Sequence, residues 1–88
     1  MTMQDLIRER LTEGLRPDDL TIADESHMHA GHAGSRPGGE THFRVDIVAS
    51  AFAGKGRVER HRVVNALLAD AFARGLHALA LKARAPGE

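Results

Sequence analysis

A helix-forming segment separates the last two predicted strands of this 88-residue chain, and that order restricts the sheet to few topologies. The helix is predicted over residues 57–74, and Gly75 predicts its end. Its apolar residues recur at the spacing of one helix face, and they are Val64, Leu67, Leu68, Ala71 and Phe72. Strands are predicted before it over residues 42–49, where apolar and polar side chains alternate, and after it over residues 76–83. A helix of about 18 residues is roughly 27 Å long, so we expect these strands to be parallel neighbours joined by a right-handed crossover.

The N-terminal part is predicted to contain one helix and one further strand. Thr2 and Asp5 match a capping box, and Gly14 followed by Pro17 predicts the end of the helix. Its apolar face consists of Met3, Leu6, Ile7, Leu11 and Leu15. Residues 20–26 alternate in polarity, which predicts a short strand that pairs antiparallel with the next one. The order α-β-β-α-β therefore predicts an α+β fold, a two-layer sandwich in which both helices cover one face of a three-stranded mixed sheet.

The composition limits the chemistry that this chain can perform alone. With 42% hydrophobic residues, we expect one domain over residues 1–88, of which residues 85–88 are a tail. The sequence has no cysteine, which excludes a disulfide framework, a thiol nucleophile, and any iron–sulfur cluster held by this chain alone. No stretch approaches the roughly 18 consecutive apolar residues of a membrane span, and the N-terminal segment resembles no signal peptide. We therefore expect a soluble cytoplasmic domain without a membrane partner, monomeric or weakly dimeric by itself.

A histidine-rich segment lies between the first two predicted strands. Its sequence over residues 27–39, HMHAGHAGSRPGG, contains too many glycines for a regular element and predicts a long loop. In the predicted topology this loop, His42 and His77 lie at the same end of the sheet. Neutral imidazole is a common metal ligand, so their convergence predicts a metal site, although the tract alone fits a solvated loop or adventitious nickel or zinc equally well. We expect His42 to face solvent and to hold the loop by a hydrogen bond, and His61 to be packed in the core.

Basic residues gather in the C-terminal part, although the net charge of the chain is zero. Those that could contact nucleic acid are Lys55, Arg57, Arg60, Arg62, Lys82 and Arg84. Cations at a helix start oppose the helix macrodipole, which favours an anionic partner, but pairing with Asp24, Glu25 or Glu40, or simple solvation, is an equal alternative. The sequence has no Trp or Tyr and only three Phe, so it offers no aromatic platform for stacking bases.

Several motifs resemble those of the BolA family in order and spacing. They are Asp24-Glu25-Ser26-x-x-His29, Gly39-Glu40-Thr41-His42-Phe43-Arg44-Val45, Phe52-x-Gly54, Arg60-His61-Arg62 and His77-Ala78-Leu79-Ala80-Leu81. The resemblance implies a class II KH-like fold, in agreement with the order predicted above. It also implies binding to a monothiol glutaredoxin with a shared [2Fe–2S] cluster, in iron–sulfur trafficking or iron and redox signalling. A second implied role is DNA-binding transcriptional regulation.

The resemblance implies the cluster ligands as well. The histidine that opens the last strand is His77, and the loop residue that matches the second ligand is His29, with the nearby His32 as an alternative. The remaining ligands would be a glutaredoxin cysteine and the thiol of glutathione. Because the sequence contains no H-E-x-x-H motif, no G-x-S-x-G motif and no cysteine, we expect no enzyme activity. Two hypotheses therefore remain, a cluster-sharing adaptor and a DNA-binding regulator.

Overall fold

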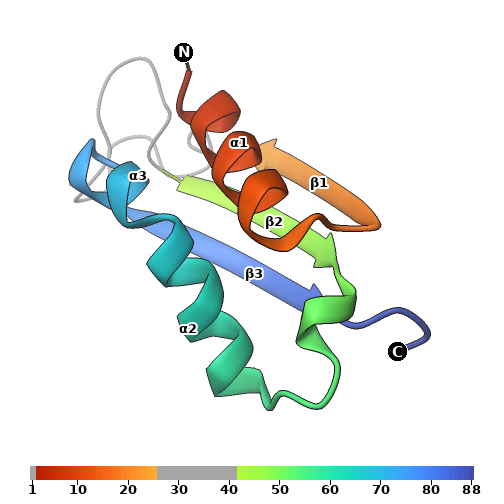
Figure 1. Cartoon of the computed structure of the whole chain (residues 1–88). Helices are drawn as coiled ribbons and strands as arrows, with labels where there is room; N and C mark the ends of the chain where they lie inside the picture. Colours follow the sequence, from red (N-terminus) through yellow and green to blue (C-terminus); the bar gives the residue numbers. More distant parts are fainter. Residues whose placement is uncertain (1, 26–41) are drawn as a thin grey trace.

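The structure, a computed structural model, describes residues 2–25 and 42–88, which form a sheet covered on one face by helices (Figure 1). The elements in chain order are α1 (Met3–Leu15), β1 (Asp19–Asp24), β2 (His42–Val48), the single 3-10 turn η2 (Ser50–Phe52), α2 (Arg57–Leu67), α3 (Ala69–Ala73) and β3 (Ala78–Arg84). The α+β class and the two-layer arrangement predicted from the sequence are confirmed.

The sheet is mixed and has the strand order β1-β2-β3, with β2 in the centre. β1 pairs antiparallel with β2, and Asp24 lies opposite Phe43 at one end of the pair. β2 pairs parallel with β3, and at the same end of the sheet His42 lies opposite Ala78. The predicted topology is confirmed, while β1 and β3 differ by up to two residues at each end from the predicted bounds. The crossover through α2 and α3 therefore returns the chain to the start of β2, as the helix length predicted.

The segment predicted as one helix over residues 57–74 is two helices, because the backbone leaves the helical region at Leu68. This residue has φ −98° and ψ 15°, and it lies between the end of α2 and the start of α3. The side chains of Val64, Leu68 and Ala71 are all fully buried, so the core contacts continue across the break. After the break Phe72 is 37% exposed, and the predicted core position of this ring is wrong.

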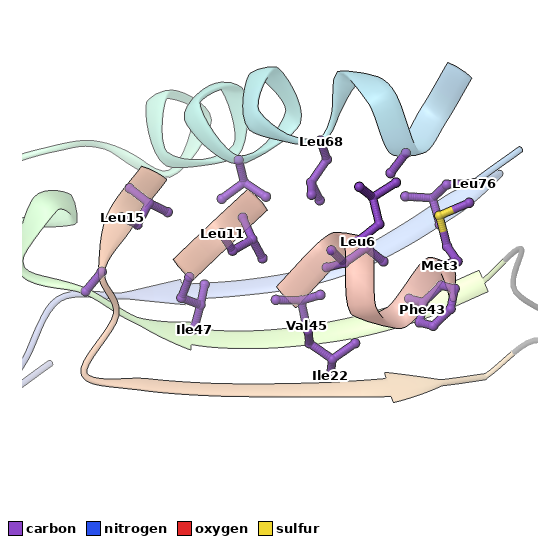
Figure 2. Close-up of a cluster of buried hydrophobic side chains, with 14 of the residues drawn as sticks. Met3, Leu6, Leu11, Leu15, Ile22, Phe43, Val45, Ile47, Leu68 and Leu76 are labelled. Atoms are coloured by element: carbon purple, nitrogen blue, oxygen red, sulfur yellow. The ribbon is translucent and has the colours of Figure 1, made fainter. Parts of the chain in front are cut away.

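The hydrophobic core lies between the helices and the inner face of the sheet (Figure 2). Its larger buried residues are Met3, Leu6, Ile7, Leu11, Leu15, Ile22, Phe43, Val45, Ile47, Phe52, Val64, Leu68 and Leu76. All five apolar residues predicted for the first helix are among them, which confirms the face that α1 presents to the sheet. Each fully buried Leu, Ile or Phe side chain contributes about 1.5–3 kcal/mol, so this layer fixes the sheet that carries the candidate site.

The capping box at the start of α1 is confirmed. The Asp5 backbone N–H donates to Thr2 Oγ1 at 3.1 Å, and the Thr2 backbone N–H donates to Asp5 Oδ2 at 3.3 Å. These reciprocal bonds satisfy N–H groups that the first helical turn leaves without intrahelical partners.

The end of α1 differs from its prediction, because Gly14 lies within the helix and does not end it. The helix continues to Leu15, and Arg16 caps it in the left-handed region with φ 47°. Gly14 instead faces α2 at close range, since a Cβ atom placed on it would lie 2.5 Å from Leu67 Cδ2. The glycine therefore allows the two helices to approach each other.

Within residues 2–25 and 42–88, no helix combines the length and the apolar character needed to cross a membrane.

Candidate functional site

The candidate site lies at the end of the sheet where β1 ends and β2 and β3 begin (Figure 1). The Glu25 backbone N–H donates to the His42 carbonyl oxygen at 2.8 Å, so the two described residues that flank segment 26–41 are held against each other. Because His42 also lies opposite Ala78, the start of β3 is their direct neighbour. The predicted ligands His29 and His32 belong to the intervening segment and lie outside the described residues.

His42 and His77 form a close pair at this position. Their ring centroids are 5.3 Å apart, and the ring planes are inclined by 55°. The parallel register causes the contact, since it sets Ala78 beside His42 and His77 is the residue immediately before Ala78. The predicted convergence of these two histidines, 35 positions apart in the chain, is therefore confirmed.

The two imidazoles differ in their access to solvent. His77 is exposed, whereas His42 is only 7% exposed and is the one buried polar residue of the described chain. The prediction that His42 faces solvent is wrong. Alternation along a strand predicts the sheet face on which a side chain lies, but it does not predict what covers that face. Here β2 is the central strand and the ring of His77 lies beside His42, so the His42 side chain is covered. The site therefore combines an accessible imidazole with a covered one.

An ion pair lies next to the histidines. Arg44 Nε donates to Glu25 Oε2 at 3.1 Å, which joins the end of β1 to β2. The Glu25 side chain is 21% exposed and the Arg44 side chain 61%, so the pair contributes at most about 1 kcal/mol. Its effect is mainly positional, because it fixes Glu25, the last described residue before segment 26–41. The sequence did not reveal this pair, since the two residues become neighbours only through the register of β1 and β2.

Two imidazoles, those of His42 and His77, are the candidate metal ligands that the structure describes at this end of the sheet. Within residues 2–25 and 42–88, no group of three or more His, Cys, Asp or Glu side chains has the arrangement of a metal site. The sequence as a whole has no cysteine to add a thiolate. A metal centre with four side-chain ligands at this pair would need at least two more ligands from elsewhere.

The six basic residues considered for nucleic acid divide into two groups. Three of them are paired: Lys55 with Glu59 at 3.5 Å, Arg84 with Asp46 at 3.1 Å, and Arg60 with Glu88. Some of these cations are thus paired with carboxylates, as the alternative in the sequence analysis held. The partners are Glu59, Asp46 and Glu88, whereas Asp24, Glu25 or Glu40 had been expected. The other three make no ion pair within the part of the chain that the structure describes, and they are Arg57, Arg62 and Lys82.

Arg60 is the most extensively bonded of these residues. Its Nη1 and Nη2 donate to the two carboxylate oxygens of Glu88 at 2.5 and 2.7 Å, and its Nε donates to the Lys55 carbonyl oxygen at 2.8 Å. The hydrogen bonds from Arg60, followed by one from the Ala85 backbone N–H, lower the pKa of Glu88 to about 2. The bond to Glu88 in turn raises the pKa of Arg60. Residues 85–88 are therefore tied to the start of α2.

A pocket of about 380 Å³ lies beside Arg60, and sequence analysis did not anticipate it. Its lining residues are Lys55, Arg57, Arg60, His61, Leu81, Lys82 and Ala83. His61 is only half-buried at this pocket, so its predicted position in the core is wrong. It follows Arg60 directly in α2 and lines the same pocket.

Comparison with known proteins gives consistent matches. The family model described as BolA-like protein matches residues 11–88. An uncharacterized protein in the cobS 5' region of Sinorhizobium sp. is 48% identical over all of this chain and 96% of its own length. Protein BOLA1, chloroplastic, of Arabidopsis thaliana is 46% identical over 93% of this chain, which spans 52% of that protein. The solved BolA domain of SufE1 from Arabidopsis thaliana has a TM-score of 0.87 at 44% identity, over 98% of this chain and 94% of that one.

Proposed function

The chain belongs to the BolA family, and from this premise we propose that it is an adaptor that binds a monothiol glutaredoxin and shares a [2Fe–2S] cluster with it. The observation that supports this proposal most is the accessible imidazole of His77 beside the buried His42. The pair lies beside the hydrogen bond between Glu25 and His42, the residues that flank segment 26–41, in which His29 and His32 occur. Such an adaptor would act in iron–sulfur trafficking or in iron and redox signalling, without catalysing a reaction itself.

The residues present are compatible with a shared cluster. A [2Fe–2S] cluster takes four ligands, and histidine pairs replace cysteine pairs on one iron in Rieske-type centres. This chain offers imidazoles but no thiolates, so the thiolates must come from a partner, here a glutaredoxin cysteine and the thiol of glutathione. A bound cluster would supply one-electron chemistry and transferable iron and sulfide.

His77 and His42 would have different roles toward the cluster. The exposed ring of His77 can reach a centre at the surface between two proteins, and we assign it as a ligand. The ring of His42 is covered, so we assign it the role of holding His77 and the neighbouring chain in position. The second ligand of this chain would be His29, or His32 in its place.

The proposal is tested by co-purifying the chain with a monothiol glutaredoxin under anaerobic conditions, with glutathione present. The visible absorption and circular dichroism spectra of the complex are then compared between the parent chain and its variants. We expect His77→Ala to change or abolish the cluster bands and His61→Ala, a matched histidine change at the distant pocket, to leave them intact. His29→Ala and His32→Ala identify the loop ligand. An unaltered spectrum for His77→Ala removes the assignment.

DNA binding is the second candidate, and it is favoured by one observation. Arg57, Arg62 and Lys82 are exposed and make no ion pair among the described residues, so they are available to phosphates. Three neutralised phosphates correspond to a slope of log affinity on log salt of about −2.7. Binding that shows no salt dependence, or that survives the triple alanine change at these positions, rules this candidate out.

A further inference from the structure

The pocket beside Arg60 is a groove with one helical and one strand wall. The helical wall consists of residues at and just before the start of α2, from Lys55 to His61, and the strand wall of residues 81–83 in β3. The groove lies toward the end of β3, whereas the histidine pair lies at its beginning (Figure 1). It is therefore a surface separate from the proposed cluster site.

The charged side chains that line the groove are all cationic among the residues that the structure describes. They are Lys55, Arg57, Arg60 and Lys82. Arg57 and Lys82 approach it from opposite walls and make no ion pair within the described residues. Two unpaired cations that face one groove attract an anion more strongly than isolated surface charges do.

A carboxylate of the chain, that of Glu88, is bound at the rim of the groove by Arg60. The Glu88 carboxylate binds Arg60 through two parallel hydrogen bonds of 2.5 and 2.7 Å, which is the fork geometry preferred between guanidinium and carboxylate. Arg60 is 13% exposed in this pair and Glu88 44%. A carboxylate is thus seated at the rim of the groove, while Arg57 and Lys82 remain available for others.

The strand wall of the groove is an edge of the sheet that, among the described residues, has no further strand beside it. The Arg84 carbonyl oxygen accepts from Ala49 on the side of β2, whereas the Ala83 carbonyl oxygen accepts from Arg60 Nη1 at 3.1 Å on the opposite side. Because backbone groups alternate along a strand, the N–H and C=O of Leu81 also point away from β2. β3 is the last strand of the sheet, so no neighbouring strand of the described residues pairs with this edge. Free edges of this kind accept extended peptides.

From these features we propose that the groove binds an extended acidic peptide segment of a partner protein. Its backbone pairs with β3 at Leu81, and its carboxylates contact Arg57 and Lys82. A peptide is favoured over nucleic acid because the edge offers backbone amide pairing, which a phosphodiester cannot return with an N–H, and because no Phe, Tyr or Trp lines the described groove. Glu88 is a neighbour of this peptide and competes with it for Arg60.

The test is a titration of the full ¹⁵N-labelled chain with blocked hexaglutamate, followed by amide chemical shifts at low salt. We expect the largest shifts at residues 81–83 and at Arg57, and none of comparable size with blocked hexaglutamine. Arg57→Ala and Lys82→Ala are each expected to weaken binding roughly two- to fivefold. Glu88→Gln is expected to strengthen it, because Arg60 is released.

Arg74→Ala is the matched control, since it removes one exposed positive charge at the end of α3, away from the groove. Equal weakening by Arg74→Ala and Arg57→Ala would show that only net charge matters and would overturn the proposal. Hexathymidylate binding more tightly than hexaglutamate would assign the groove to nucleic acid instead. Shifts confined to the start of β2 and His77 would place the acidic peptide elsewhere.

Discussion

Gly14→Ala tests how closely α1 and α2 approach each other. Gly14 is exposed and lies inside a helix, where alanine normally stabilises by about 0.8–1 kcal/mol relative to glycine. The structure predicts that a contact with Leu67 offsets this gain. A Cβ atom at this position would lie 2.5 and 2.7 Å from the two Cδ atoms of Leu67 and 3.1 Å from its Cγ.

The magnitude follows from two opposing contributions. The contacted atoms are the ends of a flexible, half-buried side chain, so Leu67 can relieve the clash by leaving its rotamer at a cost of about 0.5–1.5 kcal/mol. This cost cancels the gain in helix propensity, and Gly14→Ala should change the free energy of unfolding by less than about 0.5 kcal/mol.

The assay is urea and thermal unfolding of a double-mutant cycle with Leu67→Ala. In the Leu67→Ala background the obstruction is gone, so Gly14→Ala should stabilise by about 1 kcal/mol. Asn65→Ala on the exposed face of α2 serves as a propensity control without a clash. A Gly14→Ala change that stabilises the parent chain as much as it stabilises the Leu67→Ala variant would refute the contact between Gly14 and Leu67.

Two further predictions concern the histidine pair and the Arg60–Glu88 ion pair. His42→Ala should lower the free energy of unfolding by about 1–3 kcal/mol because it removes a buried polar side chain. His77→Ala should change it by no more than about 0.5 kcal/mol, since this side chain is exposed. Equal losses for the two variants in urea unfolding would contradict the difference in burial. The folded-state pKa of Glu88 is about 2, below its ordinary value of 4.5, so its stabilising effect is complete above about pH 4.5 and is lost as the pH falls toward 2. Glu88→Gln should therefore remove this part of the acid dependence of stability, and an unchanged pH profile would show that the ion pair does not form in solution.

The meeting of His42 and His77 could be predicted because it depends on element order and helix length alone. Once a helical segment joins two parallel strands, both strands start at the same end of the sheet, and the residue before β3 lies beside the first residue of β2. The burial of His42 could not be predicted in the same way. It depends on what the flanking strands and the His77 ring place over it, and strand alternation carries no information about that.

The groove and its ion pair were missed for a related reason. Arg60 and Glu88 are 28 residues apart, and only the return of the chain along β3 brings them together. Gly14 was misread as a helix end because glycine often follows helices, whereas its role here is set by a contact with Leu67. Both contacts, Arg60 with Glu88 and Gly14 with Leu67, join different segments of the chain, and the sequence pattern does not predict which residues of two segments meet.

The most direct test of the proposed function is to ask whether a nitrogen of this chain binds the iron. The chain is labelled with ¹⁵N-histidine, combined with an unlabelled monothiol glutaredoxin and glutathione, and the reduced cluster is examined by pulsed electron paramagnetic resonance. We predict a strong ¹⁵N coupling that His77→Ala reduces or removes and that His61→Ala preserves. A cluster without any ¹⁵N coupling from this chain, or one whose coupling survives the loss of the His77 imidazole unchanged, would contradict the assignment of His77 as a ligand.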